Sequence, residues 1–186
     1  MYLIIGLGNP ESDYSNTRHN MGFDTINKIS NECNIEVNKK KFNGLYGKGI
    51  INNEKVILVK PQTFMNLSGD CIREFVDFYK IDINKTIIIH DDIDLEPGVV
   101  KIRKKGGPGT HNGMKSVVKN LNTTEFPRVR VGIGMPEHKG DLINYVLGHI
   151  VDEDKEILDK ATTVAKDAVL EILKSGIDNA MNKINV

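Results

Sequence analysis

The chain of 186 residues has only two cysteines, no long apolar run and no net charge, and each shortage argues against a class of protein. Cys33 and Cys71 are too few for a disulfide framework and lack the spacing of metal ligands, so we expect a reduced, cytoplasmic protein. No apolar run approaches the length of a membrane-spanning helix. The apolar start at residues 1–7 is too short for a signal sequence and ends in a Gly-Asn-Pro turn, so no membrane partner is expected.

The chain has 25 basic and 25 acidic residues, so it has no overall positive charge that would indicate a nucleic-acid partner. The distribution is uneven, because the basic residues of segment 101–130 are opposed only by Glu125. A solvated face is the more common meaning of such a run, and binding of phosphates is the alternative.

Short apolar runs alternate with segments of helical spacing along the whole chain. Residues 86–89 form a continuous β-branched run, which is typical of a central strand buried on both faces. We therefore expect one α/β domain over residues 1–186, with a twisted, mostly parallel or mixed sheet sandwiched by helices. The predicted strands are 2–6, 44–51, 55–59, 86–89, 99–103 and 128–134, and the predicted helices are 22–33, 66–79, 113–121, 141–147 and 153–174.

What the sequence does contain is a set of asparagines, histidines and aspartates in glycine- or proline-marked turns. Carboxamides are costly to bury without partners, so several of them at strand-to-helix junctions indicate a polar pocket. A histidine that a carboxylate orients supplies a proton acceptor near neutral pH, and no serine or cysteine lies in a nucleophile-elbow frame. The pattern favours water activated by a histidine. The segments are 6–10 (GLGNP), 17–22 (TRHNMG), 60–69 (KPQTFMNLSG), 90–92 (HDD) and 106–113 (GGPGTHNG).

Each of these segments taken singly also has a structural interpretation. Asn9 precedes Pro10 and fits a plain turn, whereas Asn66 and Asn112 fall where helix caps are expected. His90, at the end of a buried strand, is predicted to be structural. Segment 6–10 lacks the third glycine of a dinucleotide fingerprint, and segment 105–113 lacks the Gly-Lys-Ser/Thr ending of a Walker loop. Only their shared position at strand ends favours a functional site.

The residues resemble those of the bacterial-type peptidyl-tRNA hydrolase family over essentially the whole chain. The resemblance implies hydrolysis of the ester that joins a peptide to the 3′ end of tRNA after ribosomal drop-off, which recycles the tRNA. It further implies a monomer that needs no metal and no cofactor. The matching segments, in order and with near-family spacing, are 4–10, 14 with 17–22, 60–69, 90–98, 111–116 and 128–134.

The same resemblance assigns roles to individual residues. His19 is expected to activate water, and Asp91 is expected to hold and polarise its imidazole. The expected contacts to the peptide main chain and the reacting carbonyl come from Asn9, Asn66 and Asn112, in a cleft lined by Tyr14, Phe64 and Met65. The candidates for tRNA phosphate binding are Arg103, Lys104, Lys105, Arg128 and Arg130.

One departure from the family pattern and two rival functions stand beside this assignment. Many members carry a Gly-Gly pair before the His-Asn of segment 111–112, whereas this chain has Gly109 and Thr110. An RNA-binding protein that has lost the hydrolase activity is the first rival. A metal-dependent amidase or peptidase built on segment 90–92 is the second, although no HExxH motif accompanies it.

Overall fold

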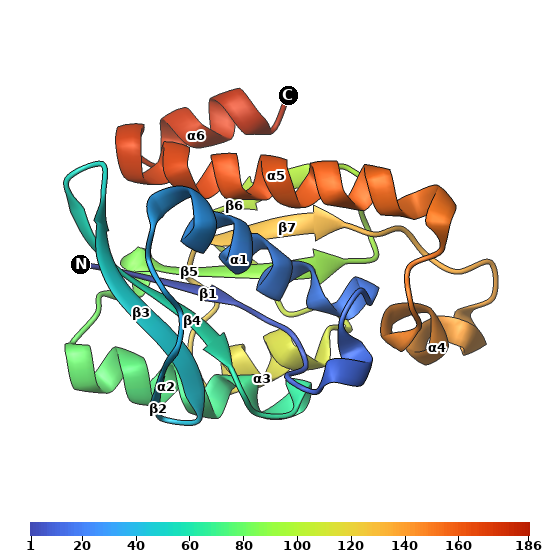
Figure 1. Cartoon of the computed structure of the whole chain (residues 1–186), viewed down its shortest axis with the longest axis horizontal. Coiled ribbons are helices and arrows are strands. Elements are labelled where there is room, and N and C mark those ends of the chain that lie inside the picture. Colours follow the sequence, from blue (N-terminus) through green and yellow to red (C-terminus); the bar gives the residue numbers. More distant parts are fainter.

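The computed structural model describes residues 1–186 and contains one seven-stranded sheet (Figure 1). Its strand order is β2-β3-β4-β1-β5-β7-β6. The four inner strands β4, β1, β5 and β7 are parallel, and the outer strands are antiparallel to their neighbours. The expected mixed α/β class is thereby confirmed. The strands are β1 (Tyr2–Gly6), β2 (Lys39–Lys41), β3 (Gly44–Ile51), β4 (Glu54–Pro61), β5 (Thr86–Asp92), β6 (Val100–Arg103) and β7 (Arg128–Gly132).

Helices cover both faces of the sheet, which gives two apolar cores (Figure 1). Ile87 and Ile89 on β5 belong to the core under α1, α5 and α6, whereas Ile88 belongs to the core under α2 and α3. The continuous apolar run of β5 is therefore explained by burial on both faces. The helices are α1 (Met21–Cys33), α2 (Ser68–Tyr79), α3 (Asn112–Leu121), α4 (Leu142–Leu147), α5 (Asp152–Ser175) and α6 (Ile177–Ile184).

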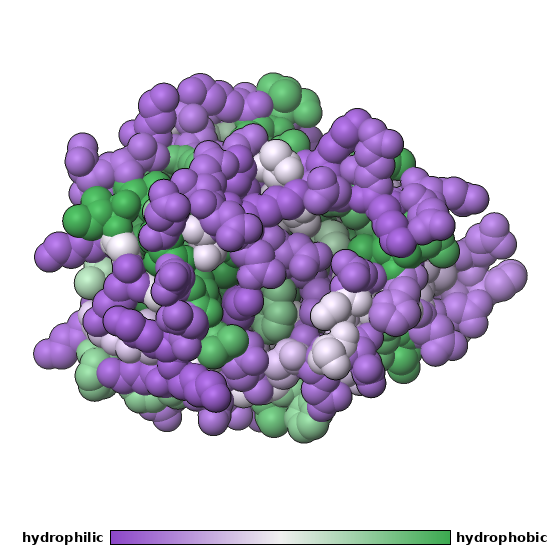
Figure 2. All heavy atoms as spheres, in the orientation of Figure 1, coloured by the Kyte–Doolittle hydropathy of each residue, from purple (hydrophilic) through white to green (hydrophobic).

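The face that carries α5 and α1 is mostly hydrophilic, with apolar groups in scattered patches (Figure 2). Helix α5 has its buried residues on one side, and these include Leu158, Ala165 and Ile172. No helix of the chain is both long enough and apolar enough to cross a membrane.

Two glycines bring the start of α1 against the end of β1. A Cβ added at Gly6 would lie 2.1 Å from the carbonyl oxygen of Gly22, and one added at Gly22 would lie 2.4 Å from the backbone nitrogen of Leu7. Any larger residue would separate the two segments. This close approach places the short 3₁₀ helix that precedes α1, Arg18–Asn20, at the carboxyl edge of the sheet.

Several predicted boundaries were wrong, and local turns account for them. Asn66 lies inside a 3₁₀ turn, Met65–Leu67, so α2 begins at Ser68 and Asn66 does not cap it. Asn112 is the first residue of α3, and the cap is instead the His111 side chain, which accepts the Met114 backbone N–H. The strands and helices that were not predicted are β2 (Lys39–Lys41) and α6 (Ile177–Ile184).

Candidate active site

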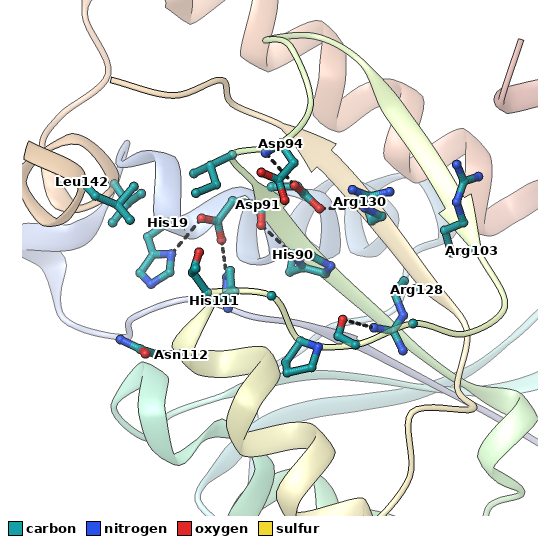
Figure 3. A pocket seen from close by; sticks show the side chains of 18 of the residues that line it. His19, His90, Asp91, Asp94, Arg103, His111, Asn112, Arg128, Arg130 and Leu142 are labelled. Atoms are coloured by element: carbon teal, nitrogen blue, oxygen red, sulfur yellow. Dashed lines mark hydrogen bonds and ion pairs between the residues drawn. The ribbon is translucent and has the colours of Figure 1, made fainter. Parts of the chain in front are cut away.

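Asp91, buried at the end of β5, lies between two histidines (Figure 3). Its Oδ2 is 2.9 Å from His19 Nδ1, and its Oδ1 is 2.8 Å from His111 Nε2. The sequence analysis paired His19 with Asp91, and the fold brings them together across 72 residues. His111, which the sequence analysis left without a role, comes from the start of the next helix, α3.

The hydrogen bonds define the tautomer of each histidine. His111 Nδ1 accepts the Met114 N–H at 3.1 Å, so the ring proton is on Nε2 and is donated to Asp91. The carboxylate of Asp91 can only accept, so His19 donates to it from Nδ1. His19 Nε2 is left with its lone pair and no hydrogen-bond partner, which is the state that a proton acceptor requires.

The same contacts shift the pKa values of this cluster. Burial alone would raise the pKa of Asp91, but His19 and His111 outweigh it and hold that pKa well below its usual range. Burial lowers the pKa of His19, yet the charge and hydrogen bond of Asp91 prevail and raise it above 6.5. Asp91 therefore stays ionised and supports a positive charge on His19 when that ring takes up a proton.

His90 stands behind the cluster in the role predicted for it, as a buried neutral residue. Its Nδ1 is 2.7 Å from the Asp91 carbonyl oxygen, and its ring meets that of His111 nearly edge-on at 5.2 Å between centroids. Burial, with a smaller electrostatic contribution from His111, lowers the pKa of His90 to about 4. His90 is thus neutral at physiological pH and cannot serve there as a charged group.

A second group of amides forms around Asn9, after β1. The Asn9 backbone N–H donates to Asn20 Oδ1 at 2.8 Å, and Asn20 Nδ2 donates back to the Asn9 carbonyl at 3.1 Å. Asn9 Oδ1 accepts the Met65 N–H at 3.2 Å, so its Nδ2 points away from these partners and has no hydrogen bond. The sequence analysis quoted Asn20 in a motif but gave it no role. In the structure its side chain forms hydrogen bonds to the backbone of Asn9.

The other residues expected to contact the peptide differ in exposure. Met65 is buried, and a Cβ added at Gly113 would lie 2.6 Å from its sulfur, so the turn before α2 packs on the start of α3. Asn66, Asn112 and Phe64 are exposed, and Tyr14 is half-buried. Their side chains therefore remain available to a ligand.

A cavity of about 400 Å³ extends from His19 to a group of arginines (Figure 3). Leu142, Ile143 and Val146 of α4 form one wall, and the glycine-rich segment 106–112 forms another. Asn112 lines this cavity, but Asn9 and Asn66 do not. The arginines and lysine that line it are Arg103, Lys105, Arg128 and Arg130.

Comparison with known proteins decides the family. The family model described as peptidyl-tRNA hydrolase matches residues 3–186. The peptidyl-tRNA hydrolase of Clostridium botulinum (strain Eklund 17B / Type B) is 55% identical over 185 residues, which is 100% of this chain and 96% of that protein. The chain belongs to the peptidyl-tRNA hydrolase family.

Other members agree in sequence and in structure. The peptidyl-tRNA hydrolase of Caldanaerobacter subterraneus subsp. tengcongensis is 51% identical, with both chains covered completely. A crystal structure of the peptidyl-tRNA hydrolase from Acinetobacter baumannii is 37% identical and superposes with a TM-score of 0.94 over 100% of this chain and 95% of that one. An Arg119Gln mutant of the Acinetobacter protein superposes with a TM-score of 0.95 at 36% identity.

The candidate phosphate-binding residues differ in the partners that their side chains already have. Arg128 is buried and donates to the carbonyl oxygens of Gly107, Thr124 and Phe126, so it fastens the glycine-rich segment. Lys104 pairs with Asp178 of α6 at 2.5 Å. The exposed Arg103 and Lys105 retain the most freedom. Arg103 donates from Nη1 only to the carbonyl oxygen of the adjacent Ile102, at 3.2 Å, and Lys105 only approaches Glu125, at 4.0 Å.

Arg130 is held in a fixed orientation at the far end of the cavity. Its Nε donates to Asp92 Oδ2 at 2.7 Å, and Asp92 Oδ1 accepts the backbone N–H of Asp94 at 2.9 Å. Only Nε takes part in this pair, so the two terminal nitrogens of the guanidinium have no hydrogen bond.

The one cluster with metal-ligand residue types in this family member is His19, Asp91 and His111, whose ligand atoms lie within 4.8 Å of one another. Each oxygen of Asp91 already accepts an imidazole N–H, so a cation between them would displace both protons. Of the segment 90–92, which was considered as a metal site from the sequence, only Asp91 belongs to this cluster. The donor set fits a hydrogen-bonded cluster better than a metal site.

Proposed function

We propose that this chain hydrolyses the ester between a peptide and the 3′ end of tRNA, with His19 as the base that activates water. Membership of the peptidyl-tRNA hydrolase family supports the reaction and the substrate. The observation that carries the mechanism is His19 itself, which holds Asp91 through Nδ1 and leaves Nε2 unprotonated beside a cavity.

The chemistry needs neither a metal nor a covalent intermediate. His19 Nε2 takes a proton from water as the water oxygen attacks the ester carbonyl carbon, and the carbonyl oxygen becomes an oxyanion. The tetrahedral intermediate then collapses, the bond to the ribose oxygen breaks, and the imidazolium returns its proton to that oxygen. Asp91 stabilises the imidazolium throughout, since its pKa keeps it ionised.

The asparagines supply donors around the reacting carbonyl. The Met65 N–H binds Asn9 Oδ1 and thereby orients the amide, and Asn9 Nδ2 remains available as a donor. Asn66 and Asn112 are exposed and present both a donor and an acceptor to the peptide main chain. One donor aimed at an oxyanion is typically worth about 3 kcal/mol, or roughly a hundredfold in rate. Contacts to the main chain alone make the enzyme tolerant of peptide sequence.

The basic end of the cavity is the proposed tRNA site. Arg103, Lys105 and Arg130 offer unoccupied N–H groups to phosphates, whereas Arg128 and Lys104 act by holding neighbouring segments in place. We place this activity on a monomer in the cytoplasm. Sedimentation of the purified protein would test the oligomeric state.

The deciding experiment is cleavage of an N-acetylated aminoacyl-tRNA in the presence of a chelator, with His19→Ala alongside. Since general-base catalysis contributes roughly 10²–10⁴-fold, His19→Ala should lose at least a hundredfold in kcat and keep its melting temperature. A fully active, folded His19→Ala protein would refute the mechanism. If the wild type binds tRNA without cleaving the ester, the non-catalytic RNA-binding alternative is supported. If chelator abolishes cleavage, the metal-dependent alternative is supported.

A further inference from the structure

Arg18, the residue before His19, is a buried arginine whose charge faces away from the reaction centre. Its side chain is 7% exposed. Nη2 donates to Asp154 Oδ2 at 2.9 Å, and Nη1 donates to the Tyr145 carbonyl oxygen at 3.3 Å. The guanidinium carbon also lies 4.1 Å from the centre of the Tyr145 ring. A residue in this position cannot bind a tRNA phosphate without leaving its partners.

These contacts connect three elements that are distant in sequence. Arg18 lies on the 3₁₀ helix Arg18–Asn20, which carries His19, while Tyr145 lies on α4 and Asp154 lies in the first turn of α5. These contacts require the planar guanidinium of arginine, because it donates to two acceptors while its face stacks on the Tyr145 ring. A lysine could keep the charge but not all three contacts.

The element at the other end of this link is one wall of the active-site cavity. Leu142, Ile143 and Val146 of α4 line the cavity, and Tyr145 on the same helix turns away from it to Arg18. The hydroxyl of Tyr145 donates to the Ile133 carbonyl beyond β7, which anchors α4 to the sheet. The position of His19 is thus tied directly to the wall against which a substrate would rest.

Backbone contacts reinforce the same junction just before Arg18. Thr17 forms an isolated antiparallel bridge with His149, and the Ile150 N–H donates to the Asn16 carbonyl at 2.8 Å. These bonds hold the main chain just before the 3₁₀ helix. Arg18 is the residue of that helix that reaches α4 and α5 through its side chain.

We infer that Arg18 is a positioning residue for the hydrolysis, which holds His19 in register with Asp91 and with the α4 wall of the cavity. The inference rests on the proposed role of His19 as the base. A misplacement of about 1 Å in a catalytic group can cost roughly a hundredfold in rate, so the position of this helix matters to the chemical step. Substrate affinity, by contrast, should depend little on a residue that touches neither the peptide nor the tRNA.

The test compares Arg18→Met and Arg18→Lys with the wild type on peptidyl-tRNA and on a short N-acetylaminoacyl ester of a 3′-terminal oligonucleotide. We expect Arg18→Met to lower kcat about tenfold to a hundredfold, equally on both substrates, while KM stays within about twofold of the wild-type value. The kcat of Arg18→Lys should lie between those of Arg18→Met and the wild type. Asp154→Ala, which removes the acceptor of Arg18 Nη2 and leaves Arg18 in place, should reproduce part of the loss. It provides a second variant if Arg18→Met does not fold.

Lys28→Met is the matched control. Lys28 also ties another element to α5, since its Nζ donates to Asp159 Oδ1 at 2.8 Å and to Thr163 at 2.8 Å, but it lies on α1 and not on the His19 helix. The control should lose stability without losing kcat. An equal kcat loss in Lys28→Met would overturn the inference, because it would show a general effect of detaching α5.

The pH profile separates positioning from simple destabilisation. The titratable groups that face His19 are Asp91 from β5 and His111 from α3, whose ring lies 4.8 Å from that of His19. If Arg18→Met loosens the contact with Asp91, burial is left unopposed and the acid limb of kcat/KM moves to lower pH. A folded Arg18→Met with wild-type kcat and pH profile would overturn the inference, as would a loss confined to peptidyl-tRNA. If His19→Ala is inactive and Arg18→Met behaves like the wild type, only the role of Arg18 is rejected. If His19→Ala is active, the role of His19 as the base is rejected.

Discussion

At the scale of single residues, the site is organised around one carboxylate that accepts two imidazole N–H groups. Asp91 receives His19 at one oxygen and His111 at the other, so neither oxygen is free to rotate toward solvent. Two charge-assisted bonds fix the carboxylate, and the carboxylate in turn fixes His19. The free lone pair of His19 Nε2 is therefore a consequence of where Asp91 is held.

Replacing Asp91 by asparagine should disable the base while keeping the shape of the site. An amide donates from Nδ2, so His19 Nδ1 would accept and its proton would move to Nε2, where water must bind. We expect kcat to fall by about 10²–10⁴-fold, as removal of general-base catalysis does, with little change in KM. Single-turnover cleavage of peptidyl-tRNA would measure the chemical step, and an unchanged rate in Asp91→Asn would contradict the assignment.

The residual activity of Asp91→Asn should also show a shifted pH dependence. In the wild type, Asp91 raises the pKa of His19 above 6.5 against the effect of burial, and we expect activity to fall as the pH drops through that pKa. Without the charge of Asp91, burial lowers the pKa, and the acid limb moves to lower pH.

The candidate site could be predicted only in part at this scale. The sequence marked His19, Asp91 and the three asparagines by type and turn context, but their pairing came from the family resemblance. His111, Asn20 and Arg18 were given no part in holding the site, because each acts through side-chain contacts, to other side chains or to backbone, that depend on the tertiary fold. No periodicity or local spacing records such contacts.

At the scale of elements, the site depends on short connections at the carboxyl edge of the parallel strands. The long amphipathic helix α5 and the apolar strand β5 were predicted well because packing fixes their patterns. The start of α2 was misplaced because a 3₁₀ turn precedes it. β2 was missed because Lys39–Lys41 shows no apolar alternation, and α6 because only Gly176, at φ 87°, separates it from α5.

The contact between β1 and α1 gives a prediction at this scale. A methyl group at Gly22 would meet the backbone of Leu7 and Ile89 at 2.4–2.5 Å, and backbone cannot yield as a flexible side chain does. We expect Gly22→Ala to lower the free energy of unfolding by about 1–3 kcal/mol or more. Urea denaturation would measure it. Gly140→Ala is the control, because nothing lies within 4 Å of its added Cβ, and an equal loss there would contradict the packing argument.

At the scale of the whole molecule, a chain without net charge has to bind a polyanion through a local arrangement of charges. The candidate phosphate-binding residues of segment 101–130 are divided between those that hold the protein together and those that face the cavity. Arg128 and Lys104 are engaged by the protein, whereas Arg103, Lys105 and Arg130 point donors toward the space beyond His19. The cavity has His19 at one end and guanidinium groups at the other, which matches a substrate with its ester and its phosphates on opposite sides.

This division predicts that Arg103→Ala weakens tRNA binding without damaging the chemistry. Because each neutralised phosphate contributes about 0.9 to the slope of log K against log salt on duplex, removal of one contact should lower that slope by about one. The kcat/KM for peptidyl-tRNA should fall, and that for a short ester without the acceptor stem should not. Lys55→Ala, an exposed lysine at the β3–β4 turn on the opposite edge of the sheet, controls for general charge. Equal losses on both substrates would place Arg103 in the chemistry of the site, and an unchanged salt slope would mean that the phosphates are bound elsewhere on the molecule.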